Sequence, residues 1–295
     1  MPQRTSLADA DCSIAQALDV VGDWWTLLIV RDTARGVHRF DALQQELGVS
    51  RKVLTERLRL LVEADVLARE PYQDRPVRYE YRLTPRGRAL LPVLIALQDW
   101  GDAWVLGEGE TMATTAESSK EAARVHALVG TRLPELLVPD HDGAPRDPVA
   151  DATPYTVLYC FPGAYARQDA YPPGWGQIPG ASGCTLESCT YRDRWAEFTE
   201  AGATVHGVST QRPDEQRAFA DAEGLRFPLL SDAGLSLTAA LRLPTFRAAG
   251  VSRLKRLTLV VGRDRTIHEA LYPITDIEAS VRTALTTVRR LSAPA

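Results

Sequence analysis

The amino-acid sequence predicts two domains, a mainly helical domain followed by an α/β domain. Its 295 residues are enough for two domains of ordinary size. Residues 12–104 carry apolar residues at helical spacing, whereas strand and helix patterns alternate after about residue 128. The weakly apolar stretch between them, residues 107–126, is expected to be a linker followed by a short helix. We therefore expect domains at residues 1–106 and 127–295.

The composition is that of a globular protein. Hydrophobic residues make up 45% of the chain and charged residues 24%. No apolar run approaches the ~20 residues of a membrane span, and residues 1–13 lack the apolar core of a signal peptide. We therefore expect a cytoplasmic protein without a membrane partner. The net charge of −4 excludes binding to nucleic acid through bulk charge, so a DNA-binding role needs a local basic patch.

The first helices of the chain are predicted from apolar residues three and four apart. The residues that set this period are Ile14, Leu18, Val21, Trp24, Leu27 and Leu28. A third helix, Phe40–Leu47, ends at Gly48. Ser50 caps a fourth helix, which runs from Arg51 to about Ala64. The short turn between these two helices is typical of a helix–turn–helix motif, whose second helix enters the major groove of DNA.

Polar and basic residues lie where this motif would meet DNA. Those near the start of the second helix, which would face base edges or phosphates, are Ser50, Arg51, Lys52, Thr55 and Arg57. Residues 69–83 then form a hairpin, whose second limb alternates apolar and polar side chains from Val77 to Leu83. Arg75 and Arg78 in this hairpin are placed to contact the DNA backbone or the minor groove. The alternative is a helical domain for protein–protein contacts with solvated arginines.

A further helix follows the hairpin and starts at Thr84-Pro85. Its apolar residues fall four and three apart, which suits packing against the same helix of a second copy. They are Leu90, Leu94, Leu97, Gly101 and Trp104. Pro92 either kinks this helix or marks its true start. We therefore expect a homodimer.

The first half of the chain resembles the HxlR-type winged-helix transcriptional regulators, relatives of the MarR group. The matching segments are Cys12–Trp25, Phe40–Leu43, Val49–Leu61 and Tyr79–Gly87. The resemblance implies a homodimer that binds a pseudo-palindromic operator, with one recognition helix in each half-site. Several members of that family sense oxidants or electrophiles through a cysteine near the N-terminus, where this chain has Cys12. The alternative for Cys12 is a small buried side chain near a helix start.

The second half alternates strands and helices, which predicts an α/β domain with a central sheet. Strands are expected at residues 155–161, 204–209, 227–230, 256–261 and 266–271. Helices are expected at residues 185–201, 214–224, 235–241 and 276–290. No internal repeat or low-complexity tract interrupts this pattern.

Two cysteines five residues apart, Cys184 and Cys189, open the first of these helices. A helix start carries free N–H groups and a partial positive charge, which are expected to lower the pKa of Cys184 and favour its thiolate. Cys189 could resolve an oxidised Cys184 as a disulfide. Residues five apart in an intact helix are separated by roughly 8 Å, whereas a disulfide needs Cα atoms ~4.4–6.8 Å apart. Disulfide formation therefore requires the first turns of this helix to unwind.

Neighbouring residues support a thiol-based site. Arg256, at the start of a strand, can project toward the sheet edge, and Glu187 could orient an arginine from the first helical turn. The segment Gly180–Gly183 leaves backbone N–H groups open to a peroxide. A zinc site is disfavoured because two cysteines without a nearby His or Cys leave the tetrahedral shell of the ion incomplete. We expect no metal and no cofactor, and two inert buried cysteines are the remaining alternative.

The second half resembles the peroxiredoxins of the AhpC/TSA group, and is most like their Q type, the bacterioferritin comigratory protein-like members. The matching segments are Phe161–Pro162, Gly183–Asp193, Val208–Thr210, Phe227–Asp232 and Arg256–Val261. The resemblance implies a thioredoxin-like fold and reduction by thioredoxin or a similar dithiol. It makes Cys184 the peroxidatic thiol, Cys189 the resolving thiol and Arg256 the activating arginine.

This half departs from the family pattern near the reactive thiol. Ala181 occupies the position of the family's threonine, and Pro162 is separated from that thiol by an inserted loop, residues 163–180. The missing hydroxyl would hydrogen-bond the bound peroxide, and the loss of one such donor costs ~10²–10³ in rate. Ser182 or Thr185 could replace it.

Together, the two halves lead to three hypotheses. In the first, the chain is a redox-responsive transcriptional regulator in which peroxide oxidises Cys184, Cys189 resolves it and DNA binding changes. In the second, it is a thiol-dependent peroxidase, an antioxidant enzyme whose winged helix serves for dimerisation or tethering. In the third, it is a plain repressor with an inactive peroxiredoxin-like half. The expected partners are operator DNA, hydrogen peroxide or an organic hydroperoxide, and a thioredoxin-like reductant.

Overall fold

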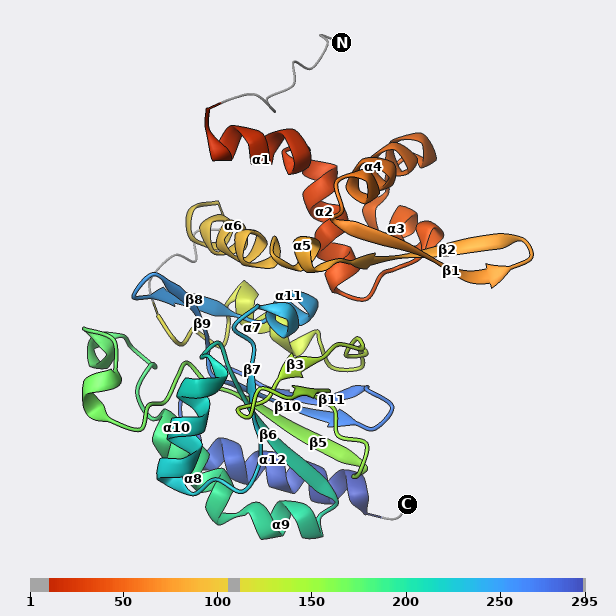
Figure 1. The fold of residues 1–295 in the computed structure, drawn as a ribbon. Helices are drawn as coiled ribbons and strands as arrows, with labels where there is room; N and C mark the ends of the chain where they lie inside the picture. Colours follow the sequence, from red (N-terminus) through yellow and green to blue (C-terminus); the bar gives the residue numbers. More distant parts are fainter. Residues whose placement is uncertain (1–10, 106–111, 294–295) are drawn as a thin grey trace. The chain divides into compact units, whose positions relative to one another are not determined.

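The computed structural model describes residues 11–105 and 112–293 of the chain (Figure 1). The chain divides into two compact units after Leu94, within helix α6 (Leu91–Trp104). The domain boundaries expected from the sequence, at residues 106 and 127, remain predictions. Among the described residues, no single helix is both long and apolar enough to span a membrane. Only the bent pair α1 (Ser13–Val21) and α2 (Trp24–Ala34) reaches that length and apolarity, when both helices are counted together.

The first unit is mainly helical and contains one hairpin, as the sequence predicts. After α1 and α2, its elements are α3 (Phe40–Leu47), α4 (Arg51–Glu63), β1 (Leu67–Asp74), β2 (Val77–Leu83) and α5 (Pro85–Arg88). Strands β1 and β2 pair antiparallel in a sheet of their own. Helices followed by a two-stranded wing confirm the predicted winged helix–turn–helix fold.

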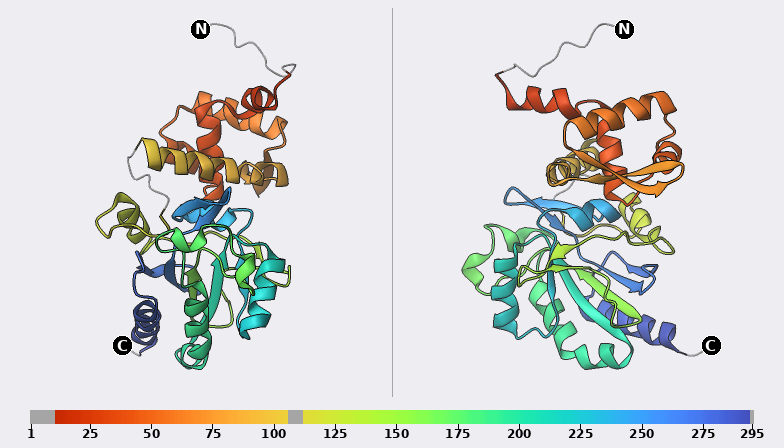
Figure 2. Two further views of the ribbon diagram at one scale, coloured as in Figure 1. Left: turned by 90° about the vertical axis from the view of Figure 1, so that its left-hand side faces the viewer. Right: turned by 45° about the vertical axis from the view of Figure 1, so that its right-hand side comes forward.

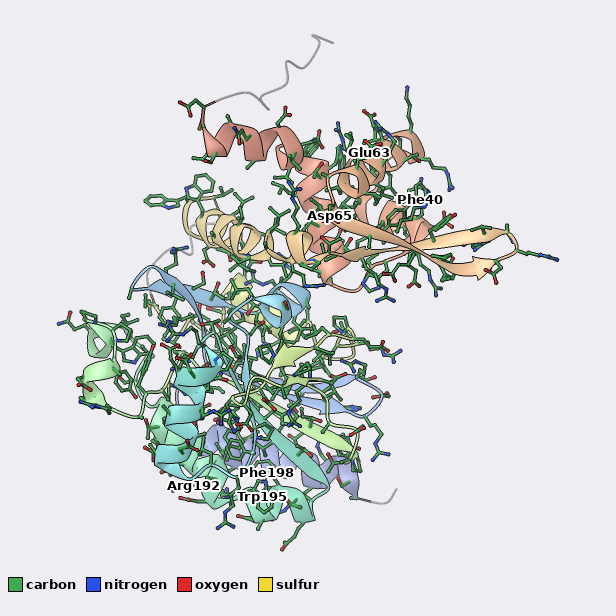
Figure 3. The ribbon with its side chains drawn as sticks, in the orientation of Figure 1. Phe40, Glu63, Asp65, Arg192, Trp195 and Phe198 are labelled. Atoms are coloured by element: carbon green, nitrogen blue, oxygen red, sulfur yellow. The ribbon has the colours of Figure 1, made fainter. Side chains whose placement is uncertain are left out.

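Short-range interactions form the turn between α3 and α4. Gly48 ends α3 with a φ of 62°, in the left-handed region that favours glycine. The Ser50 hydroxyl then accepts a hydrogen bond from the Val53 N–H at 3.4 Å, which caps α4. Figure 3 labels Phe40 and Glu63, the first residue of α3 and the last residue of α4. The predicted cap and the predicted helix stop are both confirmed.

The single helix expected after Thr84-Pro85 is two helices in the structure. Helix α5 ends at Arg88 and α6 begins at Leu91, so Pro92 is the second residue of α6. At that position the missing N–H of a proline costs no helical hydrogen bond. The exposed apolar residues of α6 lie four, three and four apart, along one stripe. They are Val93, Leu97, Trp100 and Trp104.

The second unit is built around a five-stranded sheet of order β11-β10-β5-β6-β7. The strands of this sheet are β5 (Tyr155–Cys160), β6 (Ala203–Ser209), β7 (Leu229–Ser231), β10 (Leu257–Gly262) and β11 (Ile267–Leu271). The helices are α7 (Lys120–His126), α8 (Cys184–Asp193), α9 (Trp195–Glu200), α10 (Pro213–Glu223), α11 (Ser236–Leu241) and α12 (Ile277–Ser292). Strands β5, β6 and β7 are parallel, whereas β10 is antiparallel to both of its neighbours.

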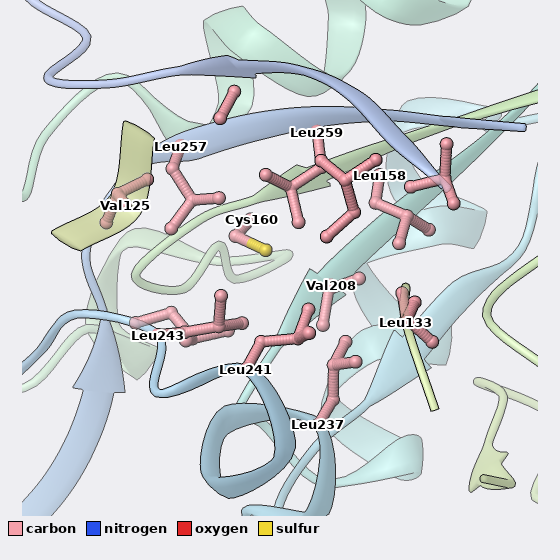
Figure 4. Packing of buried hydrophobic residues seen from close by; sticks show 14 of the residues in the cluster. Val125, Leu133, Leu158, Cys160, Val208, Leu237, Leu241, Leu243, Leu257 and Leu259 are labelled. Carbon is pink, nitrogen blue, oxygen red and sulfur yellow. The ribbon is translucent and has the colours of Figure 1, made fainter. Parts of the chain in front are cut away.

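Alternating side chains of β5 divide the core between the two faces of the sheet. Val157, Tyr159 and Phe161 pack on one face with side chains of α8, α9, α10 and α12. Leu158 and Cys160 pack on the other face with α7 and α11, and Figure 4 shows Cys160 among leucines. Figure 2 gives two further views of these helices around the sheet. This α/β arrangement confirms the predicted thioredoxin-like fold.

Two details of this unit differ from the prediction. The helix expected at residues 185–201 is interrupted at Arg194, which separates α8 from α9, and Figure 3 labels Trp195 and Phe198 in α9. Small hairpins also lie outside the main sheet, where the sequence pattern is too short to predict them. They are β3 (Val138–Pro139) with β4 (Pro145–Arg146), and β8 (Thr245–Ala248) with β9 (Val251–Leu254). The second hairpin leads directly into Arg256, just before β10.

Candidate functional site

Cys184 is the first residue of α8, and the backbone conformation of the residue before it favours glycine. Gly183 caps the helix with a φ of 99°, which favours glycine. A Cβ at this position would also lie 2.6 Å from a side-chain carbon of Ile277. The chain therefore passes close to α12 and delivers the Cys184 thiol at the start of a helix.

The Cys184 sulfur is nearly covered by protein, with 2% of the residue exposed. Arg256 Nη2 lies 3.5 Å from Sγ and also donates to the Ser182 carbonyl at 3.0 Å. The backbone amide of Gly163 also acts to lower the pKa of Cys184. The thiol itself donates to the Ala181 carbonyl at 3.4 Å. A guanidinium and an amide are thus both in position to stabilise a thiolate at Cys184.

A buried carboxylate holds the arginine in place. Glu187, one turn along α8, is fully buried and forms an ion pair with Arg256 Nη1. Its other oxygen, Oε1, is buried and has no hydrogen-bond partner among the described residues. Burial raises the pKa of Glu187 to about 7, although Arg256 acts to lower it. The predicted role of Glu187, to orient an arginine, matches this contact.

The expectation that the helix start lowers the pKa of Cys184 is wrong for this conformation. Burial raises the pKa of Cys184 above its ordinary value, Arg256 opposes that shift and the Glu187 carboxylate adds to it. The physical reason is desolvation, because the anion loses water that Arg256 and the Gly163 amide only partly replace. Burial in the reduced site therefore favours the thiol over the thiolate.

Cys189 lies on the same helix but contacts a different partner. Its thiol donates to Glu223 Oε2 at 3.3 Å, at the end of α10. Burial, followed by Glu223, raises the pKa of Cys189 to about 11. Helix α8 is continuous from Cys184 to Asp193, and the four cysteines of the chain, all of them in the described part, are free thiols. A disulfide between Cys184 and Cys189 would require this helix to open.

A cavity of about 210 Å³ lies beside Cys184. The start of α8 and the inserted loop supply its lining, which consists of Gln168, Tyr171, Trp175, Gly176, Ala181, Ser182, Gly183, Cys184 and Thr185. Ala181, at the position of the family's threonine, is fully buried and brings no hydroxyl. The Thr185 hydroxyl does lie in the lining, 3.5 Å from the Tyr171 hydroxyl. The structure thus brings both predicted substitutes, Ser182 and Thr185, to the cavity.

The predicted DNA-binding residues of the first unit lie at different depths. Lys52 and Thr55 of α4 are exposed, as are Arg75 and Arg78 of the wing. Arg57 is different, because its guanidinium forms an ion pair with Asp23 at 3.0 Å and only 21% of its side chain is exposed. Arg57 is therefore placed to hold α4 against the start of α2.

A groove of about 490 Å³ opens beside the start of α4. Its lining combines arginines and aromatic rings, namely Arg39, Phe40, Asp41, Ala42, Arg51, Tyr72, Val77, Arg78, Tyr79 and Tyr81. The Arg51 guanidinium lies 4.8 Å from the Phe40 ring centre, and that of Arg39 lies 4.4 Å from the Tyr72 ring centre. Ser50, by contrast, uses its hydroxyl as the cap of α4. Sequence reasoning missed Arg39, because it precedes the helix–turn–helix pattern by one residue.

Two family models match separate parts of the chain. One, described as HxlR-like helix-turn-helix, matches residues 20–108, and the other, described as the AhpC/TSA family, matches residues 178–270. An HTH-type transcriptional regulator of Mycobacterium tuberculosis is 46% identical over 93 residues, which are 32% of this chain and 59% of that protein. A candidate peroxiredoxin of the same organism is 30% identical over 148 residues, which are 49% of this chain and 85% of that protein.

The chain belongs to the HxlR-like family in its first half and to the AhpC/TSA family in its second. It spans less than two thirds of the length of the HTH-type regulator. The crystal structure of peroxidoxin BcpB from Mycobacterium tuberculosis matches 55% of this chain and 97% of that chain, with 28% identity and a TM-score of 0.46.

The other two cysteines lie in different environments. In the first unit, Cys12 is exposed immediately before α1, so the alternative of a buried Cys12 is wrong. In the second unit, Cys160 is fully buried in β5, and burial raises its pKa well above the ordinary value. Cys12 is open to a reagent in solution, whereas Cys160 is a core residue.

The sequence pattern alone did not point to other residues of the candidate thiol site. Tyr171 and Trp175 stand in the inserted loop, and nothing in the local sequence shows that they line a cavity beside Cys184. Gly163 and Glu223 approach the two thiols from elements 21 and 34 residues away along the chain. Such contacts depend on how distant segments fold together.

Proposed function

We propose that this chain is a redox-responsive transcriptional regulator of the cytoplasm, in which Cys184 reacts with a peroxide and Cys189 resolves the product. The observation that supports the proposal best is the Cys184 thiol at the start of α8, 3.5 Å from the Arg256 guanidinium and in the lining of a cavity. A nucleophilic thiol needs access, a neighbouring cation and a second thiol for recycling. Here the cavity corresponds to access, Arg256 is the neighbouring cation and Cys189 is the second thiol.

The proposed chemistry is a two-electron oxidation of sulfur. The Cys184 thiolate attacks one peroxide oxygen, an S–O bond forms, the O–O bond breaks, and the leaving oxygen takes a proton to become water or an alcohol. Cys189 then displaces the hydroxyl of the Cys184 sulfenic acid, which leaves as water, and a disulfide forms. A thioredoxin-like dithiol reduces this disulfide and is itself oxidised. Arg256 stabilises the negative charge on sulfur and on the leaving oxygen.

The HxlR-like domain would bind operator DNA as a homodimer. Exposed Lys52 and Thr55 of α4 are placed to face the major groove, together with Arg51 and the capping Ser50. Arg75 and Arg78 of the wing are placed for phosphate or minor-groove contacts. The apolar stripe on α6 supports dimerisation through this helix. Arg57 drops out of the proposed interface because of its ion pair with Asp23.

Contacts within the second unit support a route from the thiol to the segments that lead toward the HxlR-like domain. The Pro179 carbonyl of the inserted loop accepts a hydrogen bond from the Ala113 N–H at 2.9 Å. Thr245 of β8, in the hairpin that precedes Arg256, donates to Asp99 of α6. Opening of α8 would disturb the loop and Arg256 together, and would thereby bias both contacts.

Operator affinity tests this coupling. We expect reduced protein and protein treated with one equivalent of peroxide to differ at least about fivefold in operator Kd at fixed salt, the lower range of allosteric coupling. The operator would first be selected from a random DNA library with the reduced protein. Equal affinities in the two redox states would reject coupling. Mass-spectrometric mapping of disulfides in the same samples shows whether Cys12 takes part.

The second candidate function is a thiol-dependent peroxidase whose HxlR-like domain serves for dimerisation or tethering. A substrate-sized cavity beside Cys184 and a second thiol on the same helix favour it, because repeated turnover needs a substrate site and a route to a reducible disulfide. Peroxide-dependent oxidation of reduced thioredoxin is the assay, and Cys184→Ser should abolish it. Cys160→Ser is the matched control, because Cys160 is buried on the opposite face of the sheet. Turnover that survives Cys184→Ser would reject both candidate functions.

A further inference from the structure

The cavity beside Cys184 is larger than hydrogen peroxide needs. In the liquid, a water molecule takes about 30 Å³, and an apolar protein cavity of about 150 Å³ holds benzene. The cavity here measures about 210 Å³. A molecule with only two oxygens would leave most of it unfilled, whereas a single aromatic ring with a short side chain would fit.

The walls of the cavity are suited to an aromatic ring. Tyr171 and Trp175 of the inserted loop line it, with ring centres 6.1 Å apart at an angle of 55°. The ring centre of Tyr165 lies 4.9 Å from that of Tyr171, and the ring centre of Phe246 in β8 lies 6.4 Å from that of Trp175. Each lining ring therefore packs against a further aromatic side chain. Aromatic rings at such angles and distances attract a further ring.

The polar groups that line the cavity are uncharged, and two of the residues that carry them, Ser182 and Thr185, lie within two residues of Cys184 in the chain. The described lining residues include no charged side chain. Thr185 follows Cys184 directly in α8, and its hydroxyl is 3.5 Å from that of Tyr171. An uncharged substrate with an apolar ring at one end and a polar O–O group at the other would match this arrangement.

We propose that the cavity accepts the ring of an aryl-substituted organic hydroperoxide and holds its O–O group at the Cys184 sulfur. The inference rests on the proposed reaction of Cys184 with peroxides and names the substrate class. The thiolate attacks the terminal oxygen, the S–O bond forms as the O–O bond breaks, and the aryl alkoxide takes a proton and leaves as the alcohol. Sulfur is oxidised to the sulfenic acid and the hydroperoxide is reduced.

Rapid-mixing kinetics on the reduced full chain test this substrate class. The probes are cumene hydroperoxide, tert-butyl hydroperoxide and hydrogen peroxide, which differ in the group on the O–O unit. We expect the second-order rate constant for cumene hydroperoxide to exceed that for tert-butyl hydroperoxide at least about tenfold, the smallest preference typical of one well-filled apolar subsite. Trp175→Ala should reduce this ratio to near one. Trp24→Ala, an exposed tryptophan of the first unit, is the control that should keep the ratio.

The outcomes separate this inference from the proposed function. Equal rate constants for the two organic hydroperoxides, or a ratio that survives Trp175→Ala, would overturn the aryl pocket while leaving Cys184 as a peroxide-reactive thiol. No reaction with any of the three probes would overturn the proposed function, and the substrate class with it.

A second, independent observation concerns Cys189 and Glu223. The Cys189 thiol points to Glu223 Oε2 at 3.3 Å, in a partly buried contact between α8 and α10. Arg192 Nη1 donates to the main-chain carbonyl of Glu223 at 2.6 Å, which fixes the end of α10 beside the thiol. A resolving thiol has to lose its proton as it attacks, because the thiolate is a far better nucleophile than the thiol. A carboxylate within hydrogen-bond reach is the natural acceptor of that proton.

We infer that Glu223 is the general base for the resolving step. The proton passes from Cys189 to Glu223 as the sulfur attacks Cys184 during the unwinding of the helix, so no free thiolate forms beside the carboxylate that raises the pKa of Cys189. The S–S bond forms and the S–O bond of the sulfenic acid breaks. The leaving hydroxide takes a proton from solvent, and Glu223 returns its proton to solvent, so one water molecule is the net product. This role also rests on the proposed chemistry of the two thiols.

Two-phase kinetics test the role of Glu223. After mixing with peroxide, the first phase is sulfenic acid formation and the second is disulfide formation, read by quenching with a thiol-blocking reagent and mass spectrometry. Glu223→Gln should lower the ratio of the second rate to the first about 100-fold, the lower range for general bases. Asp221→Asn is the control, because Asp221 is exposed two residues earlier in α10. In the variant, the second phase should rise with pH in direct proportion to hydroxide.

An unchanged or faster second phase in Glu223→Gln would overturn this role and make Glu223 a structural anchor of Cys189. A missing first phase in the unmodified protein would instead overturn the proposed reaction of Cys184.

Discussion

At the scale of single residues, two opposing effects act on one sulfur. Arg256 and the Gly163 N–H stabilise the Cys184 thiolate, whereas burial and the Glu187 carboxylate favour the thiol. Burial prevails in this conformation, so the pKa of Cys184 is raised. Arg256 thus offsets part of the desolvation that raises the pKa of Cys184 and makes its thiol less reactive.

Removing the arginine should affect both stability and reactivity. In Arg256→Met, Glu187 is left as a buried carboxylate without its partner, and we expect a loss of about 3–5 kcal/mol of unfolding free energy. The reaction of Cys184 with peroxide should slow at least about 100-fold, the lower range for the loss of one stabilising donor in a preorganised site. Chemical denaturation and rapid mixing measure the two effects, and Arg226→Met, at an exposed residue, is the control. The double variant Arg256→Met, Glu187→Met should recover part of the stability, and a further loss would contradict this account.

The raised pKa of Cys184 predicts the pH dependence of its oxidation. A thiol whose pKa lies above the ordinary value is mostly protonated at pH 7, so its thiolate fraction grows as pH rises. We expect the second-order rate constant with peroxide to increase about tenfold from pH 7 to pH 8, the rise of the thiolate fraction well below the pKa. A profile that is flat from pH 6 to pH 9 would mean that the thiol is already ionised, and would contradict the effect of burial.

At the scale of elements, α8 places two thiols on one helix that has to open for them to bond. The helix is intact at its start, where the Glu187 N–H donates to the Gly183 carbonyl at 3.0 Å. Five residues of helix separate the Cα atoms of the two cysteines by more than a disulfide permits. Gly183, with its left-handed φ, precedes Cys184 and caps this helix without a side-chain hydrogen bond.

Hydrogen exchange tests this opening. After oxidation by one equivalent of peroxide, amides in the first turns of α8 should exchange faster than in the reduced protein, because their helical hydrogen bonds are lost. Mass spectrometry of peptides covering residues 184–193 measures the change. The Cys189→Ser variant is the control. It cannot form the disulfide, so the amides of α8 should stay protected from exchange when Cys184 is oxidised. Equal protection in reduced and disulfide forms would exclude unwinding.

At the scale of the whole molecule, the exposed stripe on α6 is the feature that most needs a partner. Val93, Leu97, Trp100 and Trp104 are each more than half exposed. Large apolar side chains on one face of a helix are costly in water and mark an interaction surface. An operator with two half-sites would be bound by two copies joined through such a surface.

Disrupting this stripe should separate the two copies. Trp100→Glu introduces a charge at its centre, and we expect a monomer by analytical ultracentrifugation where the unmodified chain is a dimer. Operator affinity should fall at least about 100-fold, because each half-site then binds alone. Val251→Glu, at an exposed valine of β9, is the control that should remain dimeric. A Trp100→Glu chain that stays dimeric would place the interface elsewhere.

The sequence by itself determined the order of the elements and the positions of the reactive groups along them. Helical spacing located α1 to α4, Ser50 and Gly48 set the ends of two of these helices, and alternation predicted the α/β half. These features depend on residues within a few positions of each other, where backbone geometry fixes the faces of helices and strands.

The tertiary structure alone decided what each functional side chain meets. Arg256 contacts Cys184 although 72 residues separate them in the chain, and Glu223 contacts Cys189 although 34 residues separate them. Arg57 forms an ion pair with Asp23. The aromatic wall of the cavity depends in the same way on how the inserted loop folds back. Desolvation and pairing are set by neighbours from distant segments, so the raised pKa of Cys184 could not be predicted from local spacing.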